Sequence, residues 1–271
     1  MALRLTTWNI NSVRLRIDLV ARFVAENAPD VLCLQETKCP DDQFPLAAVK
    51  AMGFRHWAFS GQKGYNGVAI FSRFSLLDVD KRHFGGKEEA RYISAMLGED
   101  AGAAAGLSVH NFYVPAGGDI ADRSVNLKFG HKLDFLSDMT EWSAAAKESR
   151  RKSILVGDLN IAPYESDVWN HKALLDVVSH TPVETKGLEA MRLAGGWTDC
   201  VRHIMPEPER VYSWWSYRSP DWDSANKGRR LDHIWTTREL DGAIRSAHIS
   251  RDVRGWDKPS DHAPVSVTLA F

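Results

Sequence analysis

Residues 153–163 read Ser153-Ile154-Leu155-Val156-Gly157-Asp158-Leu159-Asn160-Ile161-Ala162-Pro163. The run from Ser153 to Val156 is short and apolar, which is typical of a strand buried within a sheet. Polar residues follow at once, with Asp158 and Asn160 two positions apart. In extended backbone, residues two apart point to the same side of the chain. The stretch therefore predicts a buried strand whose end presents a carboxylate beside a carboxamide.

Short apolar runs alternate with helical patterns along the rest of the chain. Helices are predicted at 13–25, around 44–52 and at 127–146, and segment 98–106 is predicted to be a hairpin loop without chemistry. Strands are predicted at 3–10, 31–35, 55–60, 67–72, 75–84, 92–97, 107–114 and 153–156, with a second set at 211–217, 231–235, 243–249 and 265–269. No linker divides the sequence. The pattern predicts a single α/β domain over residues 1–271, with two mixed β-sheets packed face to face and helices outside.

Composition narrows the class of protein. The chain has 271 residues, of which 44% are hydrophobic and 25% charged, and its net charge is −1. These values are typical of a soluble globular protein with a large core. The three cysteines have no metal-binding spacing, and Cys33 lies in an apolar run, so a buried free thiol and a reducing compartment are expected. Because no signal peptide or membrane span is evident, we expect a cytoplasmic protein.

The net charge also limits how the protein can bind a polyanion. A nucleic-acid-binding protein often has an overall basic excess, and this chain has none. Any such binding must therefore depend on local positive charge or on a metal ion.

Polar residues follow several of the predicted strands, where ligand sites of α/β proteins usually form. Carboxylates stand there at Glu36, Asp158 and Asp261, and amides at Asn9 and Asn160. Such hard oxygen ligands suit Mg²⁺ or Mn²⁺ better than zinc. Clustered histidines and cysteines are too few for a zinc site. The sequence thus predicts a site for a hard divalent cation.

A histidine beside an acid is the second chemical feature. His262 follows Asp261, and another acid, Asp232, ends the run Arg230-Leu231-Asp232. A pair formed by Asp232 and His262 would be an oriented carboxylate–imidazole dyad, suited to acid or base catalysis. Sequence separation alone does not establish that the two side chains touch.

Each candidate also has a structural interpretation. Asp-x-Asn before proline is common turn chemistry, Glu36 would be a solvated strand end, and Asp261-His262 would cap a loop. Tyr113 would be a core aromatic with a satisfied hydroxyl, and Trp8 and Trp235 are expected in the core. The co-occurrence of all these segments in one chain favours a functional site.

Together these segments resemble the exonuclease III family of DNA-repair nucleases, within the deoxyribonuclease-I-like phosphodiesterase superfamily. They occur in the family's order and span nearly the whole chain. The matching pieces are Thr7-Trp8-Asn9-Ile10-Asn11, Leu34-Gln35-Glu36-Thr37-Lys38, Gly64-Tyr65-Asn66-Gly67-Val68-Ala69-Ile70-Phe71-Ser72-Arg73, Asn111-Phe112-Tyr113-Val114-Pro115, Gly157-Asp158-Leu159-Asn160-Ile161-Ala162-Pro163, Tyr212-Ser213-Trp214-Trp215, Arg230-Leu231-Asp232 and Ser260-Asp261-His262-Ala263-Pro264.

The resemblance implies a fold and an activity. The fold would be a four-layered α/β sandwich. The activity would be Mg²⁺-dependent hydrolysis of DNA phosphodiesters in base-excision repair, with Mn²⁺ as a substitute. It would comprise 3′-5′ exonuclease action on duplex DNA, cleavage 5′ to abasic sites, and removal of 3′ phosphates and other 3′ blocking groups. The partner would be double-stranded DNA, especially at abasic sites and 3′ ends. We expect a monomer, because the DNA itself would cover the functional face, and a protein that works at the nucleoid.

Carried over position by position, the resemblance implies that Asp158 activates the attacking water and Asn160 places it. His262, oriented by Asp232, would contact the scissile phosphate, and Tyr113 would stabilise that phosphate or the leaving oxygen. Which of Asp158 and His262 is the base stays open, as does the number of metal ions. The residues assigned to the metal site are Asn9, Glu36, Asp158, Asn160, Asp261 and His262.

The resemblance also implies DNA contact around this site. Basic side chains would meet backbone phosphates, and tryptophans would receive an extruded abasic sugar or a terminal nucleotide. For Trp215 a place in the core is an equal alternative, because the two faces of a strand alternate. The residues assigned to DNA are Lys38, Arg91, Trp214, Trp215, Asn226 and Arg229, with Lys227, Gly228 and Arg230 as further phosphate contacts.

Two departures from the pattern bear on the balance of activities. Arg229 stands where eukaryotic abasic endonucleases often have an aromatic residue, and segment 116–122 resembles the bacterial exonuclease type. Two other functions compete with the nuclease interpretation. One is a phosphodiesterase acting on RNA tails, inositol phosphates or sphingomyelin. The other is a nucleic-acid-binding module on an inactive scaffold, which the full set of acids disfavours.

Overall fold

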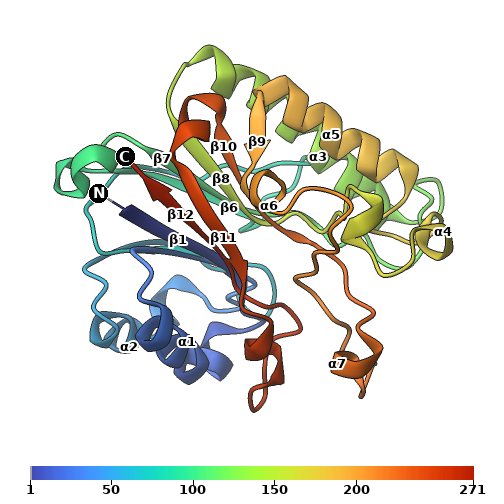
Figure 1. Ribbon diagram of the computed structural model, residues 1–271, viewed down its shortest axis with the longest axis horizontal. Coiled ribbons are helices and arrows are strands. Elements are labelled where there is room, and N and C mark those ends of the chain that lie inside the picture. Colours follow the sequence, from blue (N-terminus) through green and yellow to red (C-terminus); the bar gives the residue numbers. More distant parts are fainter. Residues whose placement is uncertain (1) are drawn as a thin grey trace.

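The computed structural model describes residues 2–271 and consists of two six-stranded sheets between helices (Figure 1). The first sheet has the order β11-β12-β1-β2-β4-β3. Its strands are β1 (Ala2–Asn9), β2 (Val31–Gln35), β3 (His56–Ser60), β4 (Val68–Ser72), β11 (Ile244–Ile249) and β12 (Val265–Ala270). The second has the order β5-β6-β7-β8-β10-β9. Its strands are β5 (Leu76–Asp80), β6 (Tyr92–Leu97), β7 (Ser108–Tyr113), β8 (Ser153–Asp158), β9 (Trp197–Asp199) and β10 (Asp232–Thr237).

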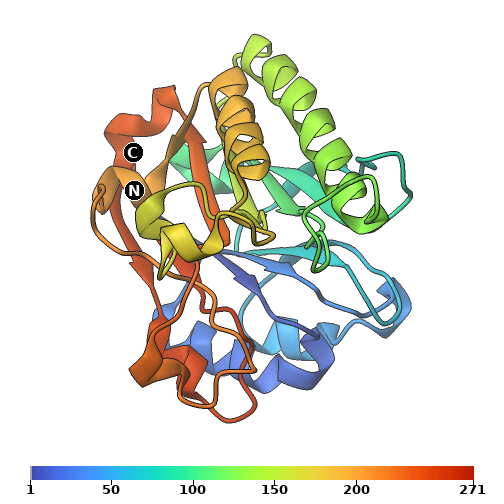
Figure 2. The same cartoon turned by 90° about the vertical axis from the view of Figure 1, so that its right-hand side faces the viewer.

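Helices cover the outer faces of both sheets (Figures 1 and 2). The first sheet is covered by α1 (Val13–Asn27) and α2 (Leu46–Ala51), and the second by α3 (Leu127–Glu148) and α5 (Pro182–Gly195). Shorter helices are α4 (His171–Leu174), α6 (Cys200–Ile204) and α7 (Trp222–Ala225). This arrangement confirms the predicted four-layered α/β sandwich. No helix of residues 2–271 is long and apolar enough to cross a bilayer.

Alternation along the central strands explains the layers. On β2, Val31 and Cys33 join the core between the two sheets, whereas Leu32 and Leu34 join the layer under α1 and α2. Both faces of the strand are thus buried, as its continuous apolar run predicts. Cys33, Cys39 and Cys200 are buried free thiols.

Each sheet contains one parallel pair of strands, and this feature places the site. β1 and β2 run parallel with α1 between them in the chain, and β7 and β8 run parallel with α3 between them. Parallel strands end at the same edge of a sheet, so Asn9 lies opposite Gln35 and Tyr113 opposite Asp158. Because β1 packs against β8 and β2 against β7, all four strand ends meet at one edge of the sandwich.

Gly157 allows the two parallel strands of the second sheet to approach closely. Its φ is +139°, and an added Cβ would lie 1.9 Å from the carbonyl oxygen of Phe112. Only glycine fits such a position. This close approach holds Asp158 beside the end of β7.

Several predictions about elements were wrong. Segment 211–217 is not a strand, because Trp214 makes only isolated bridges, to Arg229 and His262. β11 and β12 belong to the first sheet rather than to a set with β10. The predicted strand 75–84 ends at Asp80, and the predicted loop 98–106 contains a 3₁₀ turn at Glu99–Ala104. Helix α5 and strand β9 were not predicted.

Candidate active site

A cleft of about 750 Å³ opens at the edge where the central strands end. Its lining includes five of the predicted site residues, namely Glu36, Asp158, Asn160, Asp261 and His262. Asn9, Tyr113 and Asp232 lie directly behind them, in hydrogen-bond contact with these residues. The structure therefore brings together all eight residues that were predicted to act in catalysis or metal binding.

Glu36 is held by three neighbours. Its Oε1 accepts hydrogen bonds from Asn9 Nδ2 at 3.0 Å and from the Tyr113 hydroxyl at 2.7 Å. Its Oε2 lies 2.8 Å from the Lys38 ammonium. Although burial alone would raise the pKa of Glu36, these neighbours outweigh it and lower that pKa. Glu36 is therefore an ionised carboxylate at neutral pH.

Asp158 is buried at the base of the cleft and surrounded by amide donors. Asn160 donates from its backbone N–H to Oδ1 at 2.9 Å and from Nδ2 to Oδ2 at 3.1 Å. Asn9 Nδ2 also donates to Oδ2, at 2.9 Å. Burial, reinforced by Asp232 and Glu36, raises the pKa of Asp158 to about 7. A carboxyl with such a pKa is suited to exchange a proton near neutral pH.

His262 lies between two carboxylates. Its Nδ1 is 2.8 Å from Asp232 Oδ2, and its Nε2 is 3.7 Å from Asp158 Oδ2. Burial would disfavour the charged imidazole, but Asp232 and Asp158 outweigh burial and raise the pKa of His262 to about 10. The predicted dyad is thus present, and its histidine is cationic at neutral pH.

Two serines that the sequence analysis did not single out hold this dyad in place. Ser213 donates to Asp232 Oδ2 at 2.6 Å and accepts from the backbone N–H of Asp232. Ser260 donates to the Asn9 carbonyl at 2.6 Å and accepts from the backbone N–H of His262. Both serines lie inside motifs noted above. Serine in a sequence does not indicate such a role, because the role depends on contacts between segments that are distant in the chain.

The donor chemistry of the cleft fits a hard divalent cation. Four carboxylates gather at the cleft, namely Glu36, Asp158, Asp232 and Asp261. Glu36 forms an ion pair with the Lys38 ammonium. Carboxylate oxygens facing a wet cleft are the ligands that Mg²⁺ prefers. Among the four, Glu36, Asp158 and Asp261 line the cleft itself, so they would hold the ion.

Two predicted metal ligands are oriented otherwise. Asn9 turns its amide nitrogen toward Glu36 and Asp158, while its oxygen accepts from the Asn11 backbone N–H at 3.1 Å. Both ring nitrogens of His262 face carboxylates, and a protonated imidazole has no lone pair for a metal. In this arrangement Asn9 and His262 contact the carboxylates, and their role as metal ligands stays a prediction.

Several of the predicted DNA-contacting residues border the site, among them Lys227, which lines the cleft, and Lys38, which is paired with Glu36. Trp214 and Arg229 line the cleft, with the guanidinium 5.3 Å from the indole ring centre. Trp214 Nε1 donates to Asp261 Oδ2 at 2.9 Å, which joins this wall to the acidic group. Arg91 lies just outside, with its guanidinium 4.8 Å from the ring centre of Tyr113.

Other predicted DNA contacts are placed elsewhere. Trp215 is only 2% exposed and packs against Tyr212 and Ala263. Of the two places expected for Trp215, it therefore occupies the one in the core. Its indole N–H donates to Asn226, an exposed residue that does not line the cleft. Arg230 is 1% exposed and paired with Asp167 and Asp199. A phosphate contact by Trp215 or Arg230 is therefore excluded in this conformation.

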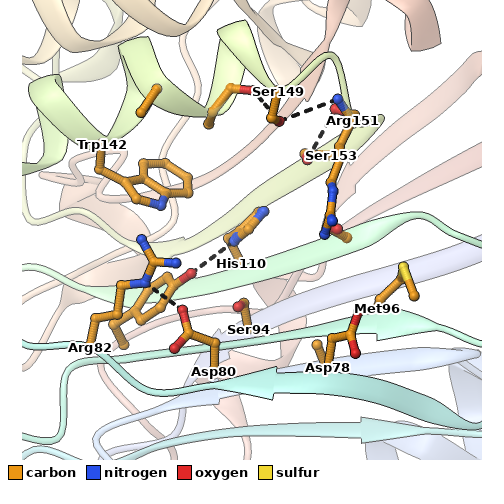
Figure 3. Close-up of a pocket in the computed structure, with 15 residues that line it drawn as sticks. Asp78, Asp80, Arg82, Ser94, Met96, His110, Trp142, Ser149, Arg151 and Ser153 are labelled. Atoms are coloured by element: carbon orange, nitrogen blue, oxygen red, sulfur yellow. Dashed lines mark hydrogen bonds and ion pairs between the residues drawn. The ribbon is translucent and has the colours of Figure 1, made fainter.

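A second hollow, of about 470 Å³, lies over β5–β8 beside α3 (Figure 3). Its lining runs along these strands, from Tyr92, the register partner of Phe112, to Ser108 and Ser153, which begin β7 and β8. Acidic and basic side chains there are balanced, and Asp80 pairs with Arg82. It lacks the excess of carboxylates that distinguishes the cleft, so it does not compete as the catalytic site.

The fold and the site together define a phosphoester hydrolase that depends on a divalent metal. Residues 6–262 match the endonuclease/exonuclease/phosphatase family. The chain is 31% identical to the exodeoxyribonuclease of Bacillus subtilis, over 98% of this chain and 99% of that one. It is also 30% identical to exodeoxyribonuclease III of Haemophilus influenzae, over 97% of this chain and 98% of that one. The chain therefore belongs to the endonuclease/exonuclease/phosphatase family and, within it, to the nucleases of the exonuclease III family.

Solved structures agree with this assignment. The 3′ phosphatase NExo from Neisseria, bound to a product DNA hairpin, superposes with a TM-score of 0.88 at 33% identity and covers 99% of this chain and 100% of that chain. The AP endonuclease from Archaeoglobus fulgidus superposes with a TM-score of 0.89 at 32% identity, with the same coverage.

Proposed function

We propose that this protein is a Mg²⁺-dependent nuclease of base-excision repair that hydrolyses phosphodiesters of duplex DNA. It would cut 5′ to abasic sites, digest duplexes from their 3′ ends and remove 3′ phosphates, with Mn²⁺ able to replace Mg²⁺. One observation carries the proposal, namely the convergence of Glu36, Asp158, Asn160 and His262 in one cleft. The DNA-repair relatives that share this fold over their full length support DNA as the substrate.

Asp158 would be the base that accepts the proton of the attacking water. Its raised pKa favours this role, and three N–H groups of Asn9 and Asn160 fix its oxygens. His262 is unsuited to the same task, because its pKa of about 10 leaves it protonated at neutral pH. This difference favours Asp158 over His262 as the base.

The neighbouring donors would stabilise the charge that builds up on the phosphate. The cationic His262 presents Nε2 toward Asp158, so a phosphate attacked by the water that Asp158 activates would lie next to positive charge. Burial, Glu36 and Asp158 raise the pKa of Tyr113 well above its usual value, so its hydroxyl remains a donor. Donors fixed before the reaction stabilise such charge with little reorganisation.

A bound Mg²⁺ would neutralise phosphate charge and favour departure of the 3′ oxygen. Glu36 would be its main ligand, since this carboxylate is ionised and reaches the cleft. Asp158 and Asp261 are the other carboxylates that line the cleft. Lys38, now paired with Glu36, would be freed to meet a DNA phosphate when the ion binds.

A substrate panel tests the proposed function. Purified protein would be given an abasic duplex, a nicked duplex with a 3′ phosphate, single-stranded RNA and an inositol polyphosphate, each with Mg²⁺ and with EDTA. We expect Mg²⁺-dependent cleavage of the two DNA substrates only. Cleavage of RNA or of the inositol phosphate in preference to DNA would refute the proposed substrate, and DNA cleavage in EDTA would refute the metal requirement.

We also propose that the protein acts as a monomer in the cytoplasm, on nucleoid DNA. The three free thiols support a reducing compartment, and the functional cleft is complete within one chain. Sedimentation analysis should find a single 30.4 kDa species, and a fluorescent fusion should overlap the nucleoid. A dimer, or a fusion outside the cytoplasm, would contradict these two proposals.

A further inference from the structure

A buried ion pair joins the two helices that cover the second sheet. Lys132 on α3 contacts Glu184 on α5, and both side chains are 0% exposed. Burying two charges costs much of what their attraction contributes, and a neutral pair of similar shape is often as stable. Its position behind the cleft therefore suggests a role other than stability.

Lys132 bonds directly to the turn that carries Asp158. Its Nζ donates to the carbonyl oxygen of Asn160 at 2.8 Å and to that of Ala116 at 3.3 Å. Asn160 has a φ of +53°, in the left-handed region. In this conformation its backbone N–H and its side chain both donate to Asp158. Lys132 thus fixes the peptide group of Asn160, and Asn160 in turn orients Asp158.

Glu184 bonds to a second segment bordering the same cleft. Its carboxylate accepts from the backbone N–H groups of Ser179 and Thr181 and from the Thr181 hydroxyl. Arg229, which lines the cleft, donates to the carbonyl of Val178 and to the hydroxyl of Ser179. The pair therefore ties the catalytic turn to one wall of the cleft.

We propose that Lys132 is a positioning residue for cleavage, which holds Asn160, and through it Asp158, in the reactive arrangement, with Glu184 as its counter-charge. This inference rests on the proposed nuclease function, because a cleavage assay is its readout. Lys132 does not reach the cleft, so it would act on the rate of the chemical step and not on DNA affinity.

The double variant K132M/E184Q separates positioning from folding. It removes both charges, so no lone charge stays buried, while methionine and glutamine keep the approximate shapes. Methionine has no donor for the Asn160 carbonyl. We expect the unfolding temperature and KM of the double variant to be close to those of the wild type. We expect its kcat to be lower by roughly 10- to 100-fold, because a small displacement of the reacting groups lowers the rate by about this factor.

Two further comparisons are matched controls. Met139→Ala, at a buried position on the same helix, should lower the unfolding temperature and leave kcat unchanged. In the Asn160→Ala background, K132M/E184Q should lower kcat by much less than in the wild-type background, because the side chain that Lys132 positions is already gone.

The outcomes distinguish this inference from the proposed function. If the wild-type protein cleaves no DNA, the proposed function fails and the inference with it. If the wild type cleaves and the folded double variant cleaves with the same kcat, or raises only KM, the positioning role is refuted. A double variant that cannot fold would also overturn it, since the pair would then be a requirement for folding.

Discussion

His233 and His262 are both buried, yet their neighbours move their pKa values in opposite directions. Arg230 donates to His233 Nδ1 at 3.2 Å, and His233 Nε2 donates to the Ile161 carbonyl at 2.9 Å, so this imidazole is neutral. Burial and Arg230 lower the pKa of His233 to about 4. His262 instead faces Asp232 and Asp158 and stays charged. At the residue scale, adjacent charges decide which histidine is structural and which serves the cleft.

His233 should make the protein sensitive to acid. In the unfolded chain a histidine binds its proton below a pH of about 6.5, whereas folded His233 resists protonation until about 4. Its contribution to stability is thus present above pH 6.5 and is lost as the pH falls. The loss between pH 6.5 and 5 is about 2 kcal/mol. His233→Gln keeps an acceptor for Arg230 and a donor for Ile161 without titrating, so urea unfolding should show a smaller loss over this range. Equal losses for variant and wild type would contradict this account of His233.

At the element scale, a buried charge network fixes the start of β10. Arg230 donates to Asp167 Oδ1 at 2.7 Å and to Asp199 at 2.7 Å, and Arg202 also contacts Asp167. These contacts join the 3₁₀ turn Glu165–Asp167 and strand β9 to the segment entering β10. Asp232, which orients His262, is two residues beyond Arg230.

Asp167→Asn should therefore destabilise the fold strongly. The change removes the negative charge that two arginines share and leaves Arg230 buried with less compensation. Breaking a buried pair in this way costs about 3–5 kcal/mol. Denaturant unfolding would measure the effect. The control is Asp134→Asn, which removes the carboxylate of an ion pair with Arg123 in which both side chains are largely exposed. A cost for Asp167→Asn no larger than that of the control would show that the network is not stabilising.

The elements also show what could be predicted from sequence. Strands at 31–35 and 92–97 were predicted with the bounds of β2 and β6. For β2 the signal is a continuous apolar run, which marks a strand buried on both faces. Helix α5 was missed although Thr181, Pro182 and Glu184 form a readable start, with a capping box and proline in the first turn. Segment 211–217 looked like a strand because it is aromatic and apolar. Its backbone groups instead bond to Arg229, Asp261 and Ser166 in surrounding loops.

The same limit applies to the site. Glu36, Asp158, Asn160 and His262 were predicted because acids and amides at strand ends suggest chemistry. Their partners Ser213, Ser260 and Lys132 were not, since serine in a loop and lysine in a helix usually face solvent. Only the fold shows that these three are buried and bonded to the site.

At the scale of the whole molecule, one core joins the two sheets. Leu5 and Val267 of the first sheet pack in the same cluster as Ile93 and Ile154 of the second. The cleft lies where both sheets end, so neither sheet alone could form it. The prediction that residues 1–271 form a single domain can be tested by unfolding.

Thermal unfolding should therefore be one cooperative transition. The loss of far-UV circular dichroism and the change in tryptophan fluorescence should coincide, because the tryptophans are divided between layers: Trp8 packs under α1, and Trp235 under α3. Two separated transitions would mean that the sheets unfold as independent units and would refute the single-domain prediction.

The central claim concerns Asp158 and a bound Mg²⁺, and single-turnover cleavage of an abasic duplex tests it most directly. The rate would be measured for the wild type and for Asp158→Asn, each with Mg²⁺ and with EDTA, after circular dichroism has shown that both are folded. We predict a nick 5′ to the lesion that EDTA abolishes and that Asp158→Asn slows by roughly 10²–10⁴-fold, the contribution of a positioned base. Equal rates for the variant and the wild type, or cleavage unaffected by EDTA, would contradict the account.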